Sequence, residues 1–333
     1  RTKPASDPVD MAMTDNKTKI GILLPTRGLL LRGDQPPNLD RVINLAEVVE
    51  QAGLDSVWVG DSLLAKPRME PLSVLGALAA RTSRVRLGTA VLLPALRHPV
   101  LLAQTLNTVD LISGGRLVIG AGVGGAFNDD QKREWEAAGV PAKGRGRRFA
   151  EIIEIVQGLG SGEPFDFHGR NFDVDSALMR PVPSQTKGIP FLLGTHHHAQ
   201  SQAQIRRAAR LGAGIISISD SPEEFAQIIE QVSEMASEFG RDPDTLDTTF
   251  YMTVNMDPDL VKAEAESVEW LTGYYGSNIW GTRWGPFGGA ERVSERIAEY
   301  VAAGAGTVIV RFASFEPEKQ LDMFLEKVVP AFI

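Results

Sequence analysis

The stretch from Val85 to Gly122 decides the fold of this chain. It begins VRLGTAVLLP (residues 85–94), passes through RHP (97–99) and ends TVDLISGGRLVIGAG (108–122). Its apolar, partly β-branched runs at 85–92 and 117–120 predict two strands, and the apolar spacing over 99–112 predicts a helix between them. A strand, a helix and a second strand in succession form a βαβ unit, in which the two strands lie parallel.

The same unit repeats on both sides of this stretch. Strands are predicted at 20–24, 56–60, 85–92, 117–120, 191–194, 214–218, 247–254 and 307–312. Helices are predicted at 39–52, 71–81, 99–112, 148–159, 202–211, 222–239, 290–303 and from Pro317 onward. Eight strands that are each followed by a helix form a closed barrel without exposed sheet edges. The predicted fold class is therefore α/β, a (β/α)8 TIM barrel with insertions at its C-terminal mouth, and an open doubly wound sheet is the alternative.

Two segments interrupt the repeat. Residues 124–188 are rich in charge, glycine and proline and hold one clear helix, so we interpret them as an insertion near the mouth. Residues 270–289 hold aromatic residues and glycines and are interpreted as a lid-like segment. Residues 1–17 are polar and aperiodic, which predicts a disordered tail without function. Residues 18–333 are then one domain.

Composition excludes several classes of protein. The chain has 333 residues, 43% of them hydrophobic, a formal net charge of −8 and no cysteine. The negative charge argues against a nucleic acid or an anionic membrane as partner, and the lack of cysteine excludes disulfides, thiolate zinc sites and a cysteine nucleophile. No apolar run approaches the roughly 18 residues that span a bilayer. We expect a cytoplasmic enzyme that acts on a small molecule.

Further segments with their own signatures are AEVVEQAGLDSVWVGD (46–61) and RAARLG (207–212). Together with residues 85–122, and in this order along the chain, they resemble the luciferase-like monooxygenase superfamily. That superfamily includes bacterial luciferase, the alkanesulfonate monooxygenases and the enzymes of the deazaflavin coenzyme F-420. The resemblance runs from Ile20 to about Phe324, and it implies a flavin or deazaflavin bound at the C-terminal mouth of a (β/α)8 barrel.

The resemblance also implies where the cofactor lies. Thr89, Ala90 and Val91 match the turn that packs against the isoalloxazine ring, often through a non-proline cis peptide bond. Residues 200–204 match the family's phosphate-binding loop, with Gln200, Ser201 and Gln204 as donors. The start of a helix attracts anions on physical grounds as well, although Ser201 could equally serve only as the N-cap.

A glycine-rich run, GAGVGG (120–125), formally satisfies the dinucleotide motif G-x-G-x-x-G. No helix opens directly after it, and no acidic residue follows at the spacing that the motif requires. We therefore expect Gly122 to allow a close approach of the backbone to the flavin, or to form a tight barrel turn, and nicotinamide binding is the alternative.

Catalytic candidates lie where predicted strands end, because the active site of a barrel lies at the C-terminal ends of its strands. Asp61 could bond the flavin edge or the substrate, or it could fix its own loop. Many relatives have a histidine after this acid, but here Ser62 follows. In the run His196-His197-His198, the first and third side chains could converge as acid, base or substrate ligand, because alternate residues of an extended chain face one way. A plain polar loop is the alternative, and no spaced partner suggests a metal site.

Substrate contacts are expected from aromatic and cationic residues near the mouth. Arg27 and Arg311 follow or end strands, and Trp280, Arg283 and Trp284 lie in the lid-like segment. An arginine beside aromatic rings suits a ring or a partly anionic substrate. The alternative for the aromatic segment is an oligomer contact.

The leading hypothesis is a flavin-dependent monooxygenase that uses reduced FMN and O2 on a small organic substrate. A separate flavin reductase would then be a partner, and a homo-oligomer is expected. The first alternative is a coenzyme F-420-dependent hydride transferase on the same scaffold. A barrel hydrolase or lyase that uses His196 to His198, and a flavin-binding protein without activity, are further alternatives.

Overall fold

The computed structural model describes residues 18–32, 37–199, 201–277 and 281–333. The predicted tail, residues 1–17, lies outside the described residues. Gln200 and Trp280 also lie outside them, as do the side chains of His198 and Thr282.

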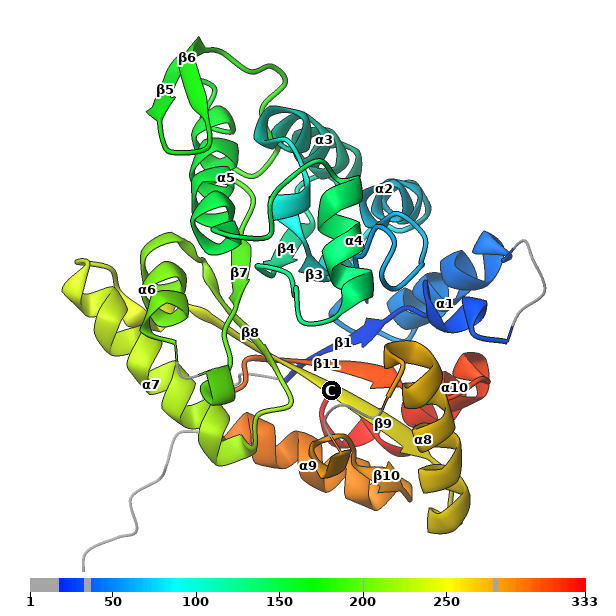
Figure 1. Cartoon of the computed structure of the whole chain (residues 1–333). Coiled ribbons are helices and arrows are strands. Elements are labelled where there is room, and N and C mark those ends of the chain that lie inside the picture. The colour runs from blue at the N-terminus through cyan, green and yellow to red at the C-terminus, as the bar shows by residue number, and fades with distance from the viewer. Residues whose placement is uncertain (1–17, 33–36, 200, 278–280) are drawn as a thin grey trace, which may run out of the picture.

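A closed parallel barrel forms the centre of the molecule (Figure 1). Its eight strands are β1 (Lys19–Leu23), β2 (Ser56–Val59), β3 (Arg86–Leu92), β4 (Leu117–Ala121), β7 (Phe191–Gly194), β8 (Gly214–Ile218), β9 (Asp247–Met256) and β11 (Thr307–Phe312). The ring closes because β9 pairs in parallel with both β8 and β11, and β11 pairs with β1. The predicted barrel is confirmed, and the open sheet is excluded.

Each barrel strand is followed by a helix that packs on the outside of the ring. These helices are α1 (Leu39–Gln51), α2 (Pro71–Arg81), α3 (Pro99–Ser113), α5 (Arg145–Leu159), α6 (Gln202–Leu211), α7 (Pro222–Glu238), α9 (Ala290–Ala302) and α10 (Pro317–Lys327). Local sequence sets their ends: Asn38 caps α1, and Gly114 ends α3 with a φ of 67°. Ser221 and Glu224 form a capping box on α7. The 3-10 turns are η1 (Gly28–Leu30), η2 (Pro94–Leu96), η3 (His197–Ala199), η4 (Pro243–Thr245), η5 (Gly281–Arg283) and η6 (Val329–Ala331).

The predicted insertion at 124–188 divides between the two ends of the barrel. Its first part, with α4 (Asp129–Ala137), lies at the C-terminal ends of the strands, and α5 is itself the fourth barrel helix. Its last part contains the antiparallel hairpin of β5 (Phe165–His168) and β6 (Asp173–Ala177). After that hairpin, Gln185 donates to the carbonyl of Leu117, the first residue of β4. The placement of this last part at the mouth was therefore wrong, because α5 runs antiparallel to the strands and delivers the chain to their N-terminal ends.

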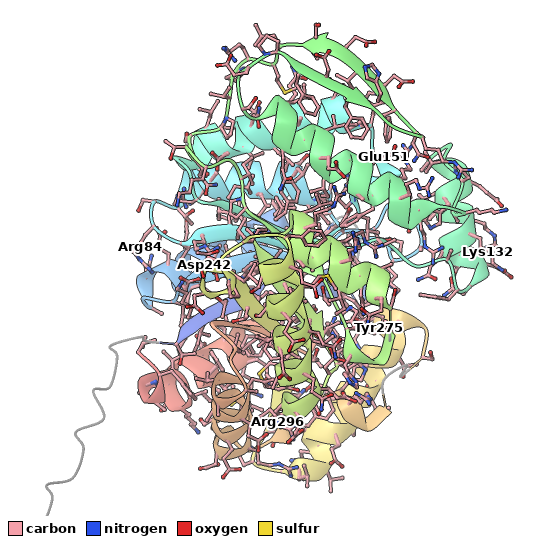
Figure 2. The ribbon with its side chains drawn as sticks, turned by 90° about the vertical axis from the view of Figure 1, so that its left-hand side faces the viewer. Arg84, Lys132, Glu151, Asp242, Tyr275 and Arg296 are labelled. Carbon is pink, nitrogen blue, oxygen red and sulfur yellow. The ribbon has the colours of Figure 1, made fainter. Side chains whose placement is uncertain are left out.

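The second interruption is more ordered than predicted. Residues Leu260–Tyr275 form a helix, α8, and the chain returns to the barrel through η5 and the short strand β10 (Phe287–Gly288), which pairs with β9. In Figure 2, Tyr275 at the end of α8 and Lys132 on α4 lie toward one side of the molecule, and Arg84 and Asp242, which precede β3 and β9, lie toward the other. The lid-like segment thus begins as a helix that places aromatic side chains over the mouth.

The interior of the barrel is filled by side chains. Trp58 on β2 is fully buried, and its indole N–H donates to Ser56 Oγ at 2.9 Å. Gly21 and Gly88 leave the space that this ring occupies, since a Cβ on either would lie 2.4 or 2.1 Å from an atom of Trp58. The packed interior leaves the C-terminal end of the barrel as the place for a ligand.

Candidate active site

A cavity of about 480 Å³ opens at the C-terminal ends of the barrel strands. Eight of the residues predicted from the sequence contribute to its wall: Asp61, Ala90, Val91, Gly122, His196, Ser201, Gln204 and Arg311. They come from strands and loops on opposite sides of the ring, which only the closure of the barrel brings together.

The turn at the end of β3 has the predicted irregularity. The Ala90–Val91 peptide bond is cis, and the pairing of β3 with β4 shifts register between Thr89 and Leu92. Ala90 and Val91 line the cavity. Thr89 does not: its side chain is buried, and its hydroxyl donates to the carbonyl of Gly120 at 2.8 Å. The prediction of Thr89 as a cofactor contact is therefore corrected to a structural role, because its side chain points into the strand packing.

Glycine backbone forms the part of the wall that lies next to this turn. A Cβ on Gly122 would lie 2.7 Å from Val91 Cγ2, so a side chain there would push into the cis turn. Gly124 adopts a φ of 83°, which favours glycine. The glycine-rich run thus works as a tight turn beside the cavity, one of the two interpretations drawn from the sequence.

Asp61 fixes a loop through a buried ion pair. Its two carboxylate oxygens accept from Arg97 at 2.5 and 3.0 Å, and one also accepts from the N–H of Leu93 at 2.8 Å. The Asp61 side chain is 1% exposed and that of Arg97 16% exposed. Both oxygens are occupied, so the geometry supports the loop-fixing interpretation of Asp61 rather than direct catalysis.

Ser62, which stands where many relatives have a histidine, organises the loop that follows. Its hydroxyl donates to the buried carboxylate of Glu134 at 2.6 Å and accepts from the N–H of Lys66 at 3.0 Å. Glu134 also accepts from the N–H groups of Leu64 and Ala65. This network on α4 bends the loop so that Lys66 and Arg68 line the cavity.

Of the histidine run, His196 lines the cavity. Its Nδ1 lies 3.4 Å from Ser217 Oγ and 4.0 Å from Asp220 Oδ2, and Ser217 in turn donates to Asp220. His197 turns away toward Glu224, with 3.8 Å between Nδ1 and Oε1. His198 lies in η3, but its side chain is outside the described part. A catalytic role for His196 or His198 stays a prediction, and the described residues contain no group of three side chains suited to a metal ion.

The start of α6 forms one end of the cavity. Ser201 is the N-cap residue, but its side chain makes no capping hydrogen bond, so the purely structural interpretation of that hydroxyl is not supported. Gln204 holds the backbone of His196, accepting from its N–H and donating to its carbonyl. Arg207, one turn later, and Arg145 at the start of α5 add two guanidinium groups to the same wall. A Cβ on Gly146 would lie 3.4 Å from Arg207 Nη1, which places these helix starts side by side.

Arg311 ends β11 inside an aromatic cage. Its guanidinium carbon lies 4.9 to 5.3 Å from the ring centroids of Tyr251, Trp270, Tyr274, Tyr275 and Trp284. It donates to Thr253 Oγ1 and, at 2.7 Å, to the hydroxyl of Tyr275. Burial opposes the charged form of Arg311, but the three tyrosines outweigh burial and raise its pKa.

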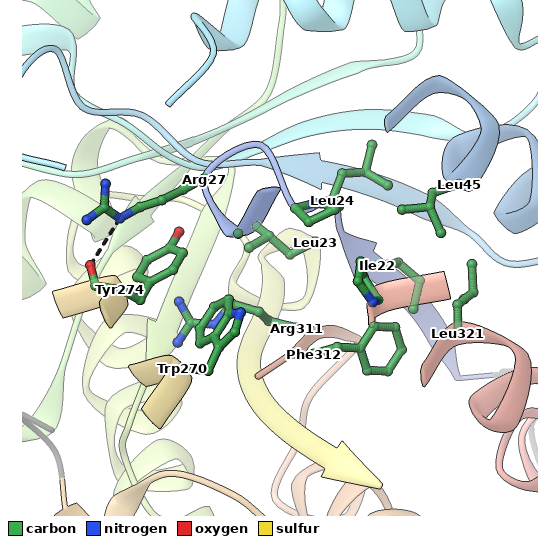
Figure 3. A pocket seen from close by; sticks show the side chains of 13 residues that line it. Ile22, Leu23, Leu24, Arg27, Leu45, Trp270, Tyr274, Arg311, Phe312 and Leu321 are labelled. Atoms are coloured by element: carbon green, nitrogen blue, oxygen red, sulfur yellow. Dashed lines mark hydrogen bonds between the residues drawn. The ribbon is translucent and has the colours of Figure 1, made fainter. Parts of the chain in front are cut away.

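Three of the predicted substrate contacts do not reach this cavity. Arg27 donates to the carbonyls of Tyr274 and Pro67, and it lines a separate cavity of about 20 Å³ (Figure 3), which has room for little more than a water molecule. Arg283 pairs with Glu224 at 2.6 Å. Trp284 is buried against Tyr275 and Arg311. Nearby protein groups already hold these three side chains, and a substrate contact from any of them stays a prediction; Trp280 and Gln200 lie outside the described residues.

Several cavity residues were missed by the sequence analysis: Lys66, Arg68, Arg145, Arg207, Tyr251, Tyr274 and Tyr275. Lys66 and Arg68 lie in the loop that follows β2 and Asp61. Their position a few residues after the end of a barrel strand is the signal that could have identified them. Arg207 stands inside the RAARLG segment. Tyr274 and Tyr275 were counted in the lid-like segment but were not proposed as contacts.

The charge of the cavity differs from that of the whole chain. Five cationic side chains (Lys66, Arg68, Arg145, Arg207 and Arg311) line it, against two carboxylates, Asp61 and Glu134. Arg97 neutralises the first carboxylate, and the second accepts three hydrogen bonds from its loop. The formal charge of the chain is −8, so this cationic cavity is a local arrangement that suits an anionic ligand.

Comparisons with known proteins place these features in a family. The family model described as luciferase-like monooxygenase matches residues 18–280. A 5,10-methylenetetrahydromethanopterin reductase of Methanopyrus kandleri is 24% identical over 92% of this chain and 98% of its own length. An F-420-dependent glucose-6-phosphate dehydrogenase of Microbacterium testaceum is 32% identical over 66% of this chain and 65% of its own length.

Solved structures agree in fold. An F-420-dependent secondary alcohol dehydrogenase, solved with an F-420-acetone adduct, has a TM-score of 0.77 at 21% identity and covers 95% of this chain and 99% of its own. A monooxygenase of Streptomyces bottropensis has the same TM-score of 0.77 at 23% identity, covering 95% of this chain and 100% of its own. Among the described residues, no helix is both long and apolar enough to cross a membrane. The family model spans well over half of the chain, and the cavity, the cis turn and the closed barrel agree with it: the chain belongs to the luciferase-like monooxygenase family and is an oxidoreductase of that family's kind.

Proposed function

We propose that this chain is a coenzyme F-420-dependent oxidoreductase that exchanges hydride with a small organic substrate at the C-terminal mouth of the barrel. The observation that carries the proposal is the pair of guanidinium groups, Arg145 and Arg207, that lie in the cavity wall beside the start of α6. F-420 joins its ring to a phosphodiester and to carboxylates, whereas FMN ends in a single phosphate. Two of the curated relatives are F-420-dependent or act on a tetrahydromethanopterin, which supports the same choice.

The residues present fit such a cofactor. The cavity volume of about 480 Å³ lies within the range typical of small-molecule sites. Ala90, Val91 and Gly122 would form the wall against the ring, since all three line the cavity and Gly122 lies next to Val91 without a side chain of its own. The start of α6, with Ser201, Arg145 and Arg207, would hold the phosphodiester, because guanidinium groups and unpaired helix N–H groups both bind phosphate oxygens.

When bound, the deazaflavin would supply a two-electron hydride donor or acceptor. The protein then has to hold the substrate, exclude water, and donate or accept the one proton that accompanies the hydride. Burial raises the pKa of Tyr274, but Arg68, Arg311 and Arg27 outweigh burial, so its pKa lies below the ordinary value of a tyrosine. The Tyr274 hydroxyl and the imidazole of His196 are the groups of the wall that we propose to hold this proton.

Titration of the purified protein with F-420, FMN and anaerobically reduced FMN tests the proposal. We expect saturable binding of F-420 and at least tenfold weaker binding of both forms of FMN, followed by ring fluorescence. Arg207→Gln and Ser201→Asp should each raise the dissociation constant of F-420 at least tenfold, about 1.4 kcal/mol. Arg147→Gln on the exposed face of α5 is the matched control and should leave it unchanged.

The outcomes separate the alternatives. Tighter binding of reduced FMN than of F-420 would contradict the proposal and would favour the hypothesis of an FMN-dependent monooxygenase. Of the two hypotheses, only that one requires a separate flavin reductase. Unchanged affinity in the Arg207 and Ser201 variants would show that the phosphate lies elsewhere. Family membership speaks against the barrel hydrolase or lyase. Tight F-420 binding without any turnover would identify a binding protein, and the expected homo-oligomer stays a prediction.

A further inference from the structure

Three cations on one side of the cavity form a compact cluster, defined here as the Lys66 cluster: Lys66, Arg68 and Arg311. They share two aromatic rings. Lys66 Nζ lies 4.5 Å and the Arg311 guanidinium 5.3 Å from the ring centroid of Tyr275. The Arg68 and Arg311 guanidinium groups lie 5.5 and 4.9 Å from the centroid of Tyr274.

The fold holds this cluster in place from separate elements. Arg311 belongs to β11 and is oriented by Thr253 and Tyr275. Lys66 and Arg68 belong to the loop after β2 that Glu134 fastens, and Arg68 Nε donates to the carbonyl of Lys66 at 3.1 Å. Arg145 and Arg207 come instead from α5 and α6, across the ring from β2 and β11 in the order of strands. The cavity therefore has two cationic regions.

The Lys66 cluster has no counter-charge within the described part of the chain. Arg311 is 2% exposed, yet its hydrogen-bond partners are a threonine hydroxyl and a tyrosine hydroxyl. Burial lowers the pKa of Lys66 to about 8, helped by Arg68, Arg27 and Arg311, and Tyr274 is the group that opposes it. A buried charge without an ionic partner is costly. Such an arrangement is maintained where a ligand brings the opposite charge.

We propose that the Lys66 cluster is a subsite for an oxyanion of the substrate, a carboxylate or phosphate group. The inference rests on the proposed function for the identity of the other ligand in the cavity. Guanidinium groups match the paired oxygens of a carboxylate or phosphate, and Lys66 adds a point charge. The rings of Tyr251, Tyr274 and Tyr275 line the cavity beside the cluster and would contact the apolar body of the substrate.

Binding of benzoate and phenyl phosphate tests the subsite. Each is titrated into the full chain, alone and with saturating F-420, by calorimetry and by tryptophan fluorescence, since Trp270 and Trp284 pack on Arg311. We expect saturable binding of at least one of the two anions, and no saturation with benzamide, the neutral analogue of benzoate. Lys66→Gln and Arg68→Gln should each weaken anion binding at least tenfold, and Arg68→Lys should weaken it less than Arg68→Gln.

Lys132→Gln and Arg133→Gln are the matched controls. Both side chains lie exposed on α4 and pair with Asp129 and Asp130, so anion affinity should not change. The melting temperature of each variant without ligand, compared with that of the parent, separates lost binding from lost folding. Arg311 is not substituted, because five rings pack on it.

Each outcome decides something. Equal binding of benzoate and benzamide, or full anion affinity in folded Lys66→Gln and Arg68→Gln variants, would overturn the subsite. Competition between F-420 and both anions would assign the cluster to the cofactor's own carboxylates and would also overturn it. Anion binding by a protein that does not bind F-420 would uphold the subsite and refute the proposed function.

Discussion

Lys66 lies half-buried at the edge of the cavity, facing Tyr274, Tyr275, Arg68, Arg27 and Arg311. Its pKa of about 8, which burial lowers from the value of a free lysine, makes it the cation in this group that titrates nearest to neutral pH. An anion bound at the Lys66 cluster needs the protonated form. Affinity should therefore be complete well below pH 8 and should fall as the pH rises through 8.

This pH dependence is measurable with benzoate or phenyl phosphate, whichever binds. The dissociation constant should rise about tenfold from pH 7 to pH 9, because Lys66 loses its proton as the pH rises through about 8. Tyr274 also has a lowered pKa and could add to the loss at higher pH. Lys66→Gln separates the two: in that variant the step near pH 8 should vanish. A step of unchanged size and position in Lys66→Gln would assign the titration to another group.

Element by element, the site depends on loops that are fastened by buried carboxylates. Asp61 ties the end of β2 to the turn after β3, because it binds both the N–H of Leu93 and the guanidinium of Arg97. Glu134 on α4 fastens the loop that carries Lys66. Asp61, the acid predicted as catalytic, thus fixes the turn after β3, and Glu134 positions the loop whose cations line the cavity.

Asp61→Asn tests this positioning role. The variant keeps the shape of the side chain but leaves Arg97 with a mostly buried, poorly compensated charge, so the free energy of unfolding should fall by about 3 kcal/mol. Urea denaturation gives that value. Glu70→Gln is the control, since Glu70 contacts the same arginine at 3.3 Å but its side chain is 46% exposed, and it should cost less than about 1 kcal/mol. Equal, small effects of both variants would contradict a structural role for Asp61.

At the scale of the whole molecule, the barrel closes around a small number of large side chains. The interior cluster of Leu23, Trp58, Ala90, Val118, Leu192, Ile216, Tyr251 and Ile309 takes one residue from each of the eight barrel strands. Tyr251 belongs both to this cluster and to the cavity wall, so interior packing and the site share a residue. A substitution in the interior should therefore affect the packing of all the barrel strands.

Gly88→Ala tests how tightly the interior is packed. The new Cβ would lie 2.1 Å from Trp58 Cε3, so the free energy of unfolding should fall by at least about 2 kcal/mol. Gly76→Ala on α2 is the matched control, because nothing lies within 4 Å of its Cβ, and it should stabilise by about 0.5 to 1 kcal/mol. If Gly88→Ala does not fold, the double variant with Trp58→Leu should restore folding. A Gly88→Ala protein as stable as the parent would refute the packing argument.

The sequence by itself determined the order of the strands and helices, because apolar periodicity, caps and glycines act over a few residues. The ends of α2, α6, β7, β8 and β11 coincide with the predicted ranges for that reason. The turn at Ala90–Val91 was expected from the resemblance to the family, and the structure has a cis peptide bond there. Helix α8 was missed because its aromatic residues suggested an irregular lid. The hairpin of β5 and β6 was not predicted, and its segment was expected at the mouth as part of the insertion.

Only the tertiary structure decided which charged groups are free to bind a ligand. Asp61, Arg27 and Arg283 are as prominent in the sequence as Arg311, yet each is already held by a partner distant in the chain. Lys66, Arg68, Arg145 and Arg207 reach the cavity through contacts between elements that the sequence does not place together. A residue type fixes what a side chain can bind, but ring closure and burial decide whether protein or ligand supplies the opposite charge.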